Sequence, residues 1–333
     1  MTEIQQHDRL AASVIIPAHN AAGTLEQCIL ACLDQTQAPV EVIVVDDGSR
    51  DRTADIAVRL PVKYVHQEQC GPAAARNHGA RMAAGAILVF TDSDCVPTRT
   101  WIEKLLAGFD AEDIVAAGGS YGIANPESRL ARIIHAEIRA RHDNMADSVD
   151  FLGSFNVAYR KAAFEAAGGF DENFTQASGE DNDLAYRLTQ LGRMRFVKDA
   201  IVDHYHPARL GSYLRSQARH GFWRMKLYAI HPGRARGDLY ASLLDLSAPP
   251  LSLLVLILLP VFLAVPVART VVAMVWSAYF LMLGIRAVKL MSDVDVRISP
   301  QGSAGLLALR DLARAWGMLK GLWVFLILRR TAR

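Results

Sequence analysis

The sequence predicts an α/β fold, with a doubly wound and mainly parallel sheet between helices, followed by C-terminal transmembrane helices. Apolar, β-branched runs alternate with stretches of helical periodicity, and this alternation is typical of βα units. Carboxylates and other polar residues directly follow three of these runs, at 17–20, 46–49 and 92–94. Two long and nearly uncharged segments lie beyond residue 245, and each is long enough to cross a bilayer.

The predicted strands are short and mostly apolar. They cover 12–17, 40–45, 62–65, 86–91, 114–119 and 153–159, with further pieces at 196–197 and 200–202. The predicted helices cover 24–34, 53–59, 73–83, 101–109, 128–142, 161–167, 180–191 and 210–230. Ligands bind at the carboxyl ends of parallel strands in open α/β sheets, so the three polar segments are expected to meet there.

The composition excludes several classes of protein. Lys and Arg number 36 against 34 Asp and Glu, a net charge of +2, so the chain lacks the basic footprint of a nucleic-acid-binding protein. The four cysteines show neither Cys-x-x-Cys nor zinc spacing, which fits a reducing compartment. There is no dinucleotide fingerprint, P-loop or nucleophile elbow. The polar N-terminus lacks the apolar core of a signal peptide, so we expect the catalytic part in the cytosol.

The segment Asp92-Ser93-Asp94 ends the buried strand predicted at 86–91. Residues two apart on a strand point to the same side, so the two carboxylates can converge at the strand end. Paired carboxylates repel each other unless a cation lies between them, and oxygen ligands suit Mg²⁺ or Mn²⁺. The pattern is consistent with a metal site, and a solvated loop after a strand is the alternative.

A second acidic segment, Glu180-Asp181-Asn182-Asp183, begins a helix. Carboxylates are favoured in the first turn of a helix, where they complement its dipole. Capping needs only one carboxylate, so the surplus predicts that one of them faces a site. A carboxylate there can act as a general base when it lies within hydrogen-bond reach of the proton that it removes.

Two further segments carry candidate ligands. His204 and His206 alternate along an extended segment, and a neutral imidazole at His204 is assigned as a metal ligand. A hydrogen-bonded surface histidine is the alternative. The strand predicted at 153–159 has polar residues at its start, and we assign Ser154 and Asn156 to the acceptor side.

Taken together, the motifs resemble the family 2 glycosyltransferases, in particular a bacterial membrane-anchored type. The resemblance rests on Ser-Val-Ile-Ile-Pro-Ala-His-Asn at 13–20, Val-Val-Asp-Asp-Gly-Ser at 44–49, Gly-Pro-Ala-Ala-Ala-Arg-Asn at 71–77, Thr-Asp-Ser-Asp at 91–94, Gly-Gly-Phe-Asp-Glu at 168–172 and Gly-Glu-Asp at 179–181. These motifs occur in the family's order and cover residues 11–225. No single motif is specific, but the combination is.

The resemblance implies a GT-A fold and an inverting, metal-dependent transfer from a nucleoside diphosphate sugar. By position, it implies that the donor side comprises Pro17 and Ala18 against the nucleotide, Asp47 on the base, Arg76 near the nucleotide and phosphates, and Asp92 on the ribose or metal. It implies Asp94 as the main metal ligand, Asp181 as the base that deprotonates the acceptor hydroxyl, and Glu180 as a residue that shapes the acceptor site. A single inverting displacement needs no protein nucleophile, and the sequence shows none.

One feature of processive synthases in this family is missing. Those enzymes carry Gln-x-x-Arg-Trp on a helix after the base, whereas the nearest candidate here is Gln-Ala-Arg-His-Gly at 217–221. The sequence therefore favours transfer of one sugar over polymerisation.

The chain is divided into a cytosolic domain at 1–235 and a membrane domain at 236–333. Transmembrane helices are predicted at about 247–266 and 268–289, and an amphipathic interfacial helix at about 303–328, with a third span as its alternative. Arg269 is the one cation near the junction of the two spans, whereas cationic residues flank the pair on both sides (Arg234, Arg236, Lys289 and Arg297). The positive-inside rule therefore places the hairpin tip outside and both flanks in the cytosol.

These observations predict a hexosyltransferase at the inner (plasma) membrane, with its catalytic domain on the cytoplasmic side. The expected donor is a nucleoside diphosphate sugar, with a UDP-sugar favoured, and the expected cofactor is Mg²⁺ or Mn²⁺. The expected partners are membrane lipids and a lipid-linked or membrane-proximal acceptor, in cell-envelope or exopolysaccharide (polysaccharide) biosynthesis. A noncatalytic nucleotide-sugar-binding scaffold and a nucleotidyltransferase are the alternatives, and two spans are too few for a transport component acting alone.

Overall fold

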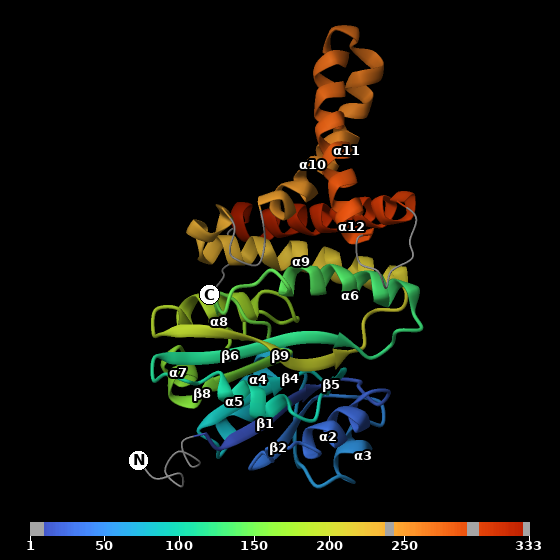
Figure 1. Cartoon of the computed structure of the whole chain (residues 1–333). Coiled ribbons are helices and arrows are strands. Elements are labelled where there is room, and N and C mark those ends of the chain that lie inside the picture. The colour runs from blue at the N-terminus through green and yellow to red at the C-terminus, as the bar shows by residue number, and fades with distance from the viewer. Residues whose placement is uncertain (1–9, 237–242, 292–299, 329–333) are drawn as a thin grey trace. The chain divides into compact units, whose positions relative to one another are not determined.

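The computed structural model describes residues 10–236, 243–291 and 300–328. These residues form two compact units (Figure 1). The first comprises residues up to Asn125 together with Arg141–His206, and the second comprises Pro126–Ala140 and Pro207–Arg333. The unit that holds the C-terminal helices thus begins earlier than residue 236 and also includes a helical segment from the middle of the chain.

The first unit is built on one mixed sheet with the strand order β3-β2-β1-β4-β8-β6-β9-β5. Its strands are β1 (Ala12–Ala18), β2 (Glu41–Asp47), β3 (Lys63–Gln67), β4 (Ile87–Thr91), β5 (Cys95–Pro97), β6 (Ile114–Ile123), β7 (Ser148–Val149), β8 (Asn156–Arg160) and β9 (Arg193–His204). Strands β1 to β4 are parallel to one another, as expected. β8 is antiparallel to both β4 and β6, so the second half of the sheet is mixed rather than mainly parallel.

The reversal at β8 has a structural cause. A parallel pair needs a crossover connection that packs on the sheet. The helix between β6 and β8, α6 (Arg129–His142), has most of its residues in the second unit. Because that crossover is missing, β8 lies beside β6 in the opposite direction.

Helices cover the two faces of the sheet and bury separate cores. On one face lie α2 (Leu25–Leu33), α3 (Thr53–Ala57) and α5 (Trp101–Ala107), and on the other lie α4 (Pro72–Met82), α7 (Lys161–Ala166) and α8 (Glu180–Leu188). Adjacent residues of β1 serve different cores: Val14 and Ile16 pack with the first group and Ile15 with the second. This alternation explains why β1 is apolar throughout.

Strand β9 is one element where the sequence predicts two pieces. It pairs with β6 in parallel, and the register shifts between Gly119 and Ser120. The extra residues of β9 at this bulge include the exposed Lys198 and Asp199, which interrupt the apolar pattern. A polar interruption at a bulge therefore has the same sequence signature as a break between two strands.

The second unit is helical. Besides α6 it contains α9 (Leu210–Ile230), α10 (Leu243–Ala264), α11 (Arg269–Met291), α12 (Pro300–Gly321) and the short elements η1 (Pro232–Arg236), η2 (Pro266–Ala268) and η3 (Leu322–Ile327), of which η3 is a π-helical turn. α9 and α12 pack closely because glycines stand at their contact. A Cβ on Gly317 would lie 1.8 Å from the carbonyl oxygen of Ala218, and one on Gly321 would lie 2.4 Å from that of Phe222.

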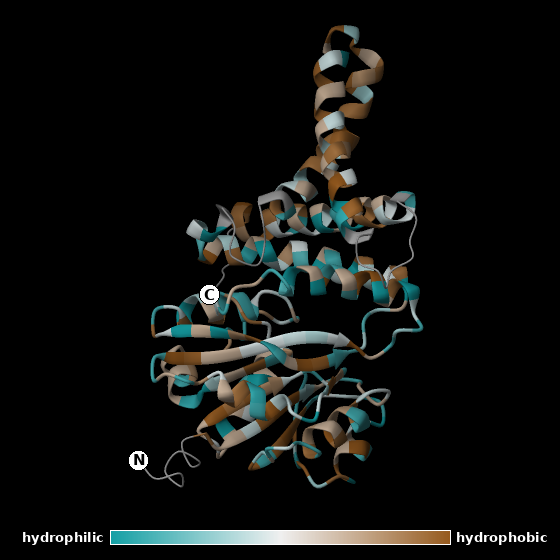
Figure 2. Cartoon of the chain, in the orientation of Figure 1, coloured by the Kyte–Doolittle hydropathy of each residue, from teal (hydrophilic) through white to brown (hydrophobic). Residues whose placement is uncertain are grey.

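Two helical segments of this unit are long and apolar enough to cross a membrane, Asp245–Ala264 and Pro266–Lys289. Figure 2 shows the predominance of apolar residues along α10 and α11. Only 17% of the most apolar window of the first segment and 28% of that of the second are buried inside the protein. A core helix of a soluble protein would be mostly buried, so the low burial favours the predicted hairpin.

Candidate active site

The candidate site begins where parallel strands β1, β2 and β4 end side by side. In the register of β1 and β2, Pro17 lies opposite Val45 and Ala18 opposite Asp46. The loops that follow are joined directly, since Nδ1 of His19 lies 2.7 Å from the carbonyl oxygen of Asp47. The structure therefore brings the polar segments at 17–20 and 46–49 to one edge, beside the end of β4.

Asp47 is held in place by three donors. Its Oδ1 accepts hydrogen bonds from Nε2 of Gln67 and the backbone N–H of Cys70, and its Oδ2 accepts one from the N–H of Gly71, each at 2.8 Å. The side chain is buried at the carboxyl end of β2. A carboxylate offers about four acceptor positions, so Oδ2 retains one for a further donor.

Arg76 of α4 joins two parts of the site that are far apart in the sequence. The residue is 1% exposed. Nη2 donates to Oδ1 of Asp92 at 2.7 Å, and Nη1 donates to Oε1 of Glu180 at 3.0 Å. Although burial opposes its charge, Asp92 and Glu180 raise the pKa of Arg76 above its ordinary value. The end of β4 and the start of α8, which carries Glu180, are therefore bound to one buried cation.

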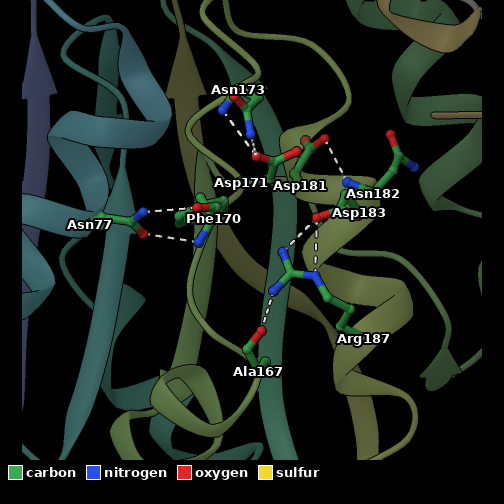
Figure 3. Close-up of polar contacts among 9 residues, drawn as sticks. All are labelled: Asn77, Ala167, Phe170, Asp171, Asn173, Asp181, Asn182, Asp183 and Arg187. Atoms are coloured by element: carbon green, nitrogen blue, oxygen red, sulfur yellow. Dashed lines mark hydrogen bonds and ion pairs between the residues drawn. The ribbon is translucent and has the colours of Figure 1, made fainter. Parts of the chain in front are cut away.

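The three carboxylates at the start of α8 have different partners. Glu180 pairs with Arg76 and accepts a hydrogen bond from the backbone N–H of Ser178. Asp183 pairs with Arg187 one helical turn later. Asp181 accepts a hydrogen bond from the backbone N–H of Asn182, and no ion pair joins it to a cation among the described residues (Figure 3). Asp181 is thus the carboxylate of this turn that is not neutralised.

The environment of Asp181 suits a proton acceptor. Burial and the neighbouring charge of Glu180 raise the pKa of Asp181 to about 7, against the opposing effect of Arg76. A general base is most effective when its pKa lies near the working pH.

The turn that follows α7 is anchored to α4. Asn77 donates from Nδ2 to the carbonyl oxygen of Phe170 at 2.8 Å and accepts from its N–H at 2.9 Å (Figure 3). Gly168 and Gly169 both have positive φ, which lets the chain turn tightly at this point. Arg187 of α8 in turn donates to the carbonyl oxygen of Ala167. These contacts fix the direction in which α8 enters the site.

Asp94 and His204 form a pair that fits a divalent metal. Ligand atoms of Asp94, Cys95 and His204 all lie within 4.8 Å of one another, and Nε2 of His204 is 3.4 Å from Oδ2 of Asp94. Burial opposes both charges, yet their interaction lowers the pKa of Asp94 and raises that of His204. Burial and the charge of Asp94 raise the pKa of Cys95, so this thiol stays protonated and is a poor ligand for a hard cation. The side chains here that suit a divalent metal are therefore the carboxylate of Asp94 and the imidazole of His204.

Comparison with known proteins identifies the family to which the chain belongs. The profile described as Glycosyl transferase family 2 matches residues 13–168. Glycosyltransferase AglE of Haloferax volcanii is 32% identical over 236 residues, which cover 66% of this chain and 74% of that protein. The chain belongs to glycosyl transferase family 2. It is also 30% identical, over 67% of its own length, to a pre-mycofactocin glycosyltransferase of Mycobacterium tuberculosis, of which it spans only 48%.

A solved structure supports the fold of this family 2 glycosyltransferase. The mannosyltransferase PcManGT of Pyrobaculum calidifontis, in complex with GDP-Man and Mn²⁺, is similar with a TM-score of 0.56 at 20% identity. The similarity covers 94% of this chain and 87% of that one. The expected α/β fold of the GT-A type is thus confirmed, together with two C-terminal helices that are long and apolar enough to span a membrane.

The two residues assigned to the acceptor side are both buried. Asn156 is 1% exposed, and its amide is fully engaged: Oδ1 accepts from Nε1 of Trp101, and Nδ2 donates to the carbonyl oxygens of Ser120 and Ala200. Ser154 is 5% exposed. The contacts of Asn156 join β8 to β6 and β9, so we do not carry it into the proposed site of this glycosyltransferase.

The sequence interpretation overlooked Asn125, which follows β6. Its Nδ2 donates to the carbonyl oxygen of His206 at 2.8 Å, and its Oδ1 accepts from the N–H of His206 at 3.1 Å. His206 is itself buried, and its Nδ1 lies 3.0 Å from Nδ1 of His204. Asn125 thus fixes the segment that presents His204 to Asp94. The only feature of the sequence that could have identified Asn125 as a site residue was its position at the end of a strand.

Proposed function

We propose that this family 2 glycosyltransferase moves one sugar from a nucleoside diphosphate sugar to an acceptor hydroxyl, with inversion of configuration. The observation that carries the proposal is the buried bridge from Asp92 through Arg76 to Glu180. It joins the strand edge assigned to the donor to the turn that holds Asp181, whose pKa of about 7 suits a base. A donor site and a base in fixed relation are what a direct displacement requires.

In the proposed donor site, Pro17 and Ala18 lie against the nucleotide and Asp47 accepts a hydrogen bond from the base through the free position of Oδ2. Arg76 lies near the nucleotide and phosphates, and Asp92 contacts the ribose or the metal. A UDP-sugar remains the favoured donor, although PcManGT was solved with GDP-Man. Donor identity is thus open to direct measurement.

In the proposed metal site, Asp94 and His204 hold Mg²⁺ or Mn²⁺. The ion would neutralise charge on the leaving diphosphate. Support comes from the oxygen and imidazole donors at the end of β4 and from the Mn²⁺ in the PcManGT complex. Cys95 is left out of the ligand set because its thiol stays protonated.

On the proposed acceptor side, Asp181 takes the proton of the attacking hydroxyl, while Glu180 and Ser154 shape the site. Glu180 keeps the pKa of Asp181 high and holds Arg76 in place. The two apolar helices support an acceptor that is lipid-linked or close to a membrane, in envelope or exopolysaccharide synthesis. We place the catalytic unit on the cytoplasmic side of the inner membrane, as the flanking cations favour.

The test is donor turnover by the purified full chain in detergent. A panel of UDP- and GDP-sugars is incubated with Mn²⁺ and a polyprenyl-phosphate acceptor, and release of nucleoside diphosphate is measured. Wild type is expected to turn over one donor, and Asp181→Asn to lose at least about 100-fold, as expected for removal of a general base. Asp34→Asn, a control at an exposed carboxylate of the same unit, should retain full activity.

Two outcomes would contradict the proposal. Equal and negligible turnover by wild type and Asp181→Asn, with the donor still raising the melting temperature, would indicate a noncatalytic binding protein. Release of diphosphate from a nucleoside triphosphate would indicate a nucleotidyltransferase instead.

A further inference from the structure

The helix α12 buries two adjacent charged residues and exposes a row of apolar ones. Arg310 is 1% exposed and Asp311 is fully buried. Along the opposite side of α12 and η3 lies a stripe of exposed apolar residues, at helical spacing: Leu309, Trp316, Leu319, Trp323 and Leu326. A helix that faces water has the reverse arrangement, with its apolar face inward.

The buried charges of α12 are neutralised by two neighbouring helices. Arg310 pairs with Glu137 of α6. Asp311 accepts two hydrogen bonds from Arg286 of α11, at 2.7 and 3.2 Å. Buried charges are retained in proteins when they are paired and hydrogen-bonded in this way. The polar side of α12 is therefore committed to contacts within its own unit, and the stripe is the side that remains for another partner.

The charge of the second unit indicates the chemistry of that partner. Its residues include 20 Lys and Arg against 7 Asp and Glu, a net charge of +13. The remaining residues of the chain include 16 against 27, a net charge of −11. The near-neutral total thus hides a strongly basic helical unit. Anionic lipids attract basic segments at the membrane surface.

The helix α12 adjoins the two membrane-spanning candidates through its buried side. Leu307 of α12 packs in one buried cluster with Ala248 of α10 and with Tyr279 and Leu283 of α11. Trp is enriched where a membrane meets water, and two of the five stripe residues are Trp. Nζ of Lys320 lies 4.9 Å from the ring centroid of Trp316, which suits a side chain whose ammonium stays at the headgroups.

We propose that the stripe of α12 and η3 docks in the boundary between headgroups and acyl chains of a bilayer that contains anionic phospholipids. The occupant is lipid rather than a second copy of the chain, because the neighbouring hairpin is itself exposed and apolar and because a basic unit repels its own copy. This inference needs the hairpin to enter a membrane, but it does not depend on the transfer reaction.

The experiment places an environment-sensitive dye (NBD) on the full chain in vesicles. Cys70→Ser removes the only free cysteine that is exposed among those described. Leu319→Cys then labels the stripe, and Leu30→Cys labels α2 of the first unit as a matched control, since both leucines are about equally exposed (41% and 49%). Vesicles are made of phosphatidylcholine with and without phosphatidylglycerol, and quenching by doxyl-labelled lipids is measured.

We expect dye at 319 to emit at shorter wavelength than dye at 30 and to be quenched by doxyl lipids. The quenching should increase when the vesicles contain phosphatidylglycerol and decrease at high salt. Two results would overturn the proposal. Water-like emission at 319, quenched by iodide as at 30, would mean that the stripe stays in water. Blue-shifted emission that doxyl lipids leave unchanged would mean that protein, such as a second copy, covers the stripe.

Discussion

Arg76 shows what one buried residue contributes to the site. Its ion pairs with Asp92 and Glu180 satisfy carboxylates from two elements that are 16 and 104 residues away in the sequence. Removing one member of a buried pair leaves the other uncompensated, at a cost of roughly 3–5 kcal/mol. Arg76 therefore supports the fold and fixes the end of β4 relative to the first turn of α8.

The pKa of Asp181 leads to a prediction about the effect of pH. The base must be ionised to accept a proton, so kcat/KM should rise with pH up to about 7 and level off above it. Glu180→Gln removes a charge that raises this pKa, so the midpoint should move to lower pH even if the maximal rate also falls. Profiles of kcat/KM against pH measure the midpoint of the wild type and its shift in Glu180→Gln. The control Glu165→Gln, at an exposed carboxylate, should leave the midpoint unchanged. An unshifted midpoint in Glu180→Gln would argue against Asp181 as the titrating base.

For single residues, the residue pattern predicts the acidic turn but does not distinguish its carboxylates, and only the family resemblance assigned Asp181 as the base. Glu180, Asp181 and Asp183 all suit a helix N-terminus, and only the positions of Arg76 and Arg187 distinguish them. The assignment of Asn156 to the acceptor side met a related ambiguity. A polar residue at a strand end can face a ligand or join strands, and spacing carries no information about Trp101, Ser120 and Ala200, which satisfy it.

At the scale of elements, the contact between α9 and α12 depends on glycine. Gly317 has no room for a Cβ, whereas nothing lies within 4 Å of a Cβ on Gly305 of the same helix. Gly317→Ala should therefore lower stability by about 1–3 kcal/mol through overpacking. Gly305→Ala should raise it by roughly 0.5–1 kcal/mol, because alanine favours a helix. Thermal unfolding of both variants in detergent measures the difference, and equal melting temperatures would show that the helices are not closely packed there.

Elements with a strong periodic pattern could be predicted from the sequence. The direction or orientation of an element that depends on contacts with distant segments could not. The early strands and helices lie close to their predicted positions because each buries an apolar face against the sheet. The direction of β8 depends on where α6 packs, and the orientation of α12 depends on Glu137 and Arg286. Both are properties of distant segments, so local pattern cannot reveal them.

At the scale of the whole molecule, charge is divided between the two units although the total is +2. The composition alone suggests a nearly neutral protein, but the catalytic unit is acidic and the helical unit basic. On charge alone, an anionic surface should attract the basic helical unit and repel the acidic first unit. The fold thus separates a part suited to cations and solvent from a part suited to lipid.

The orientation of the hairpin is the last prediction, and it follows from the distribution of cations. Val267, in the turn between α10 and α11, is 89% exposed, and the nearby Arg269 donates to the carbonyl oxygens of Phe262 and Leu263. A tip with one cation that is already engaged should cross the membrane more readily than the basic flanks. In intact cells, an impermeant thiol reagent should label Val267→Cys in a Cys70→Ser background, and should label Cys70 of the wild type only after the membrane is opened. Labelling of Cys70 from outside would reverse the assigned orientation, and protection of position 267 until lysis would show that the hairpin does not cross.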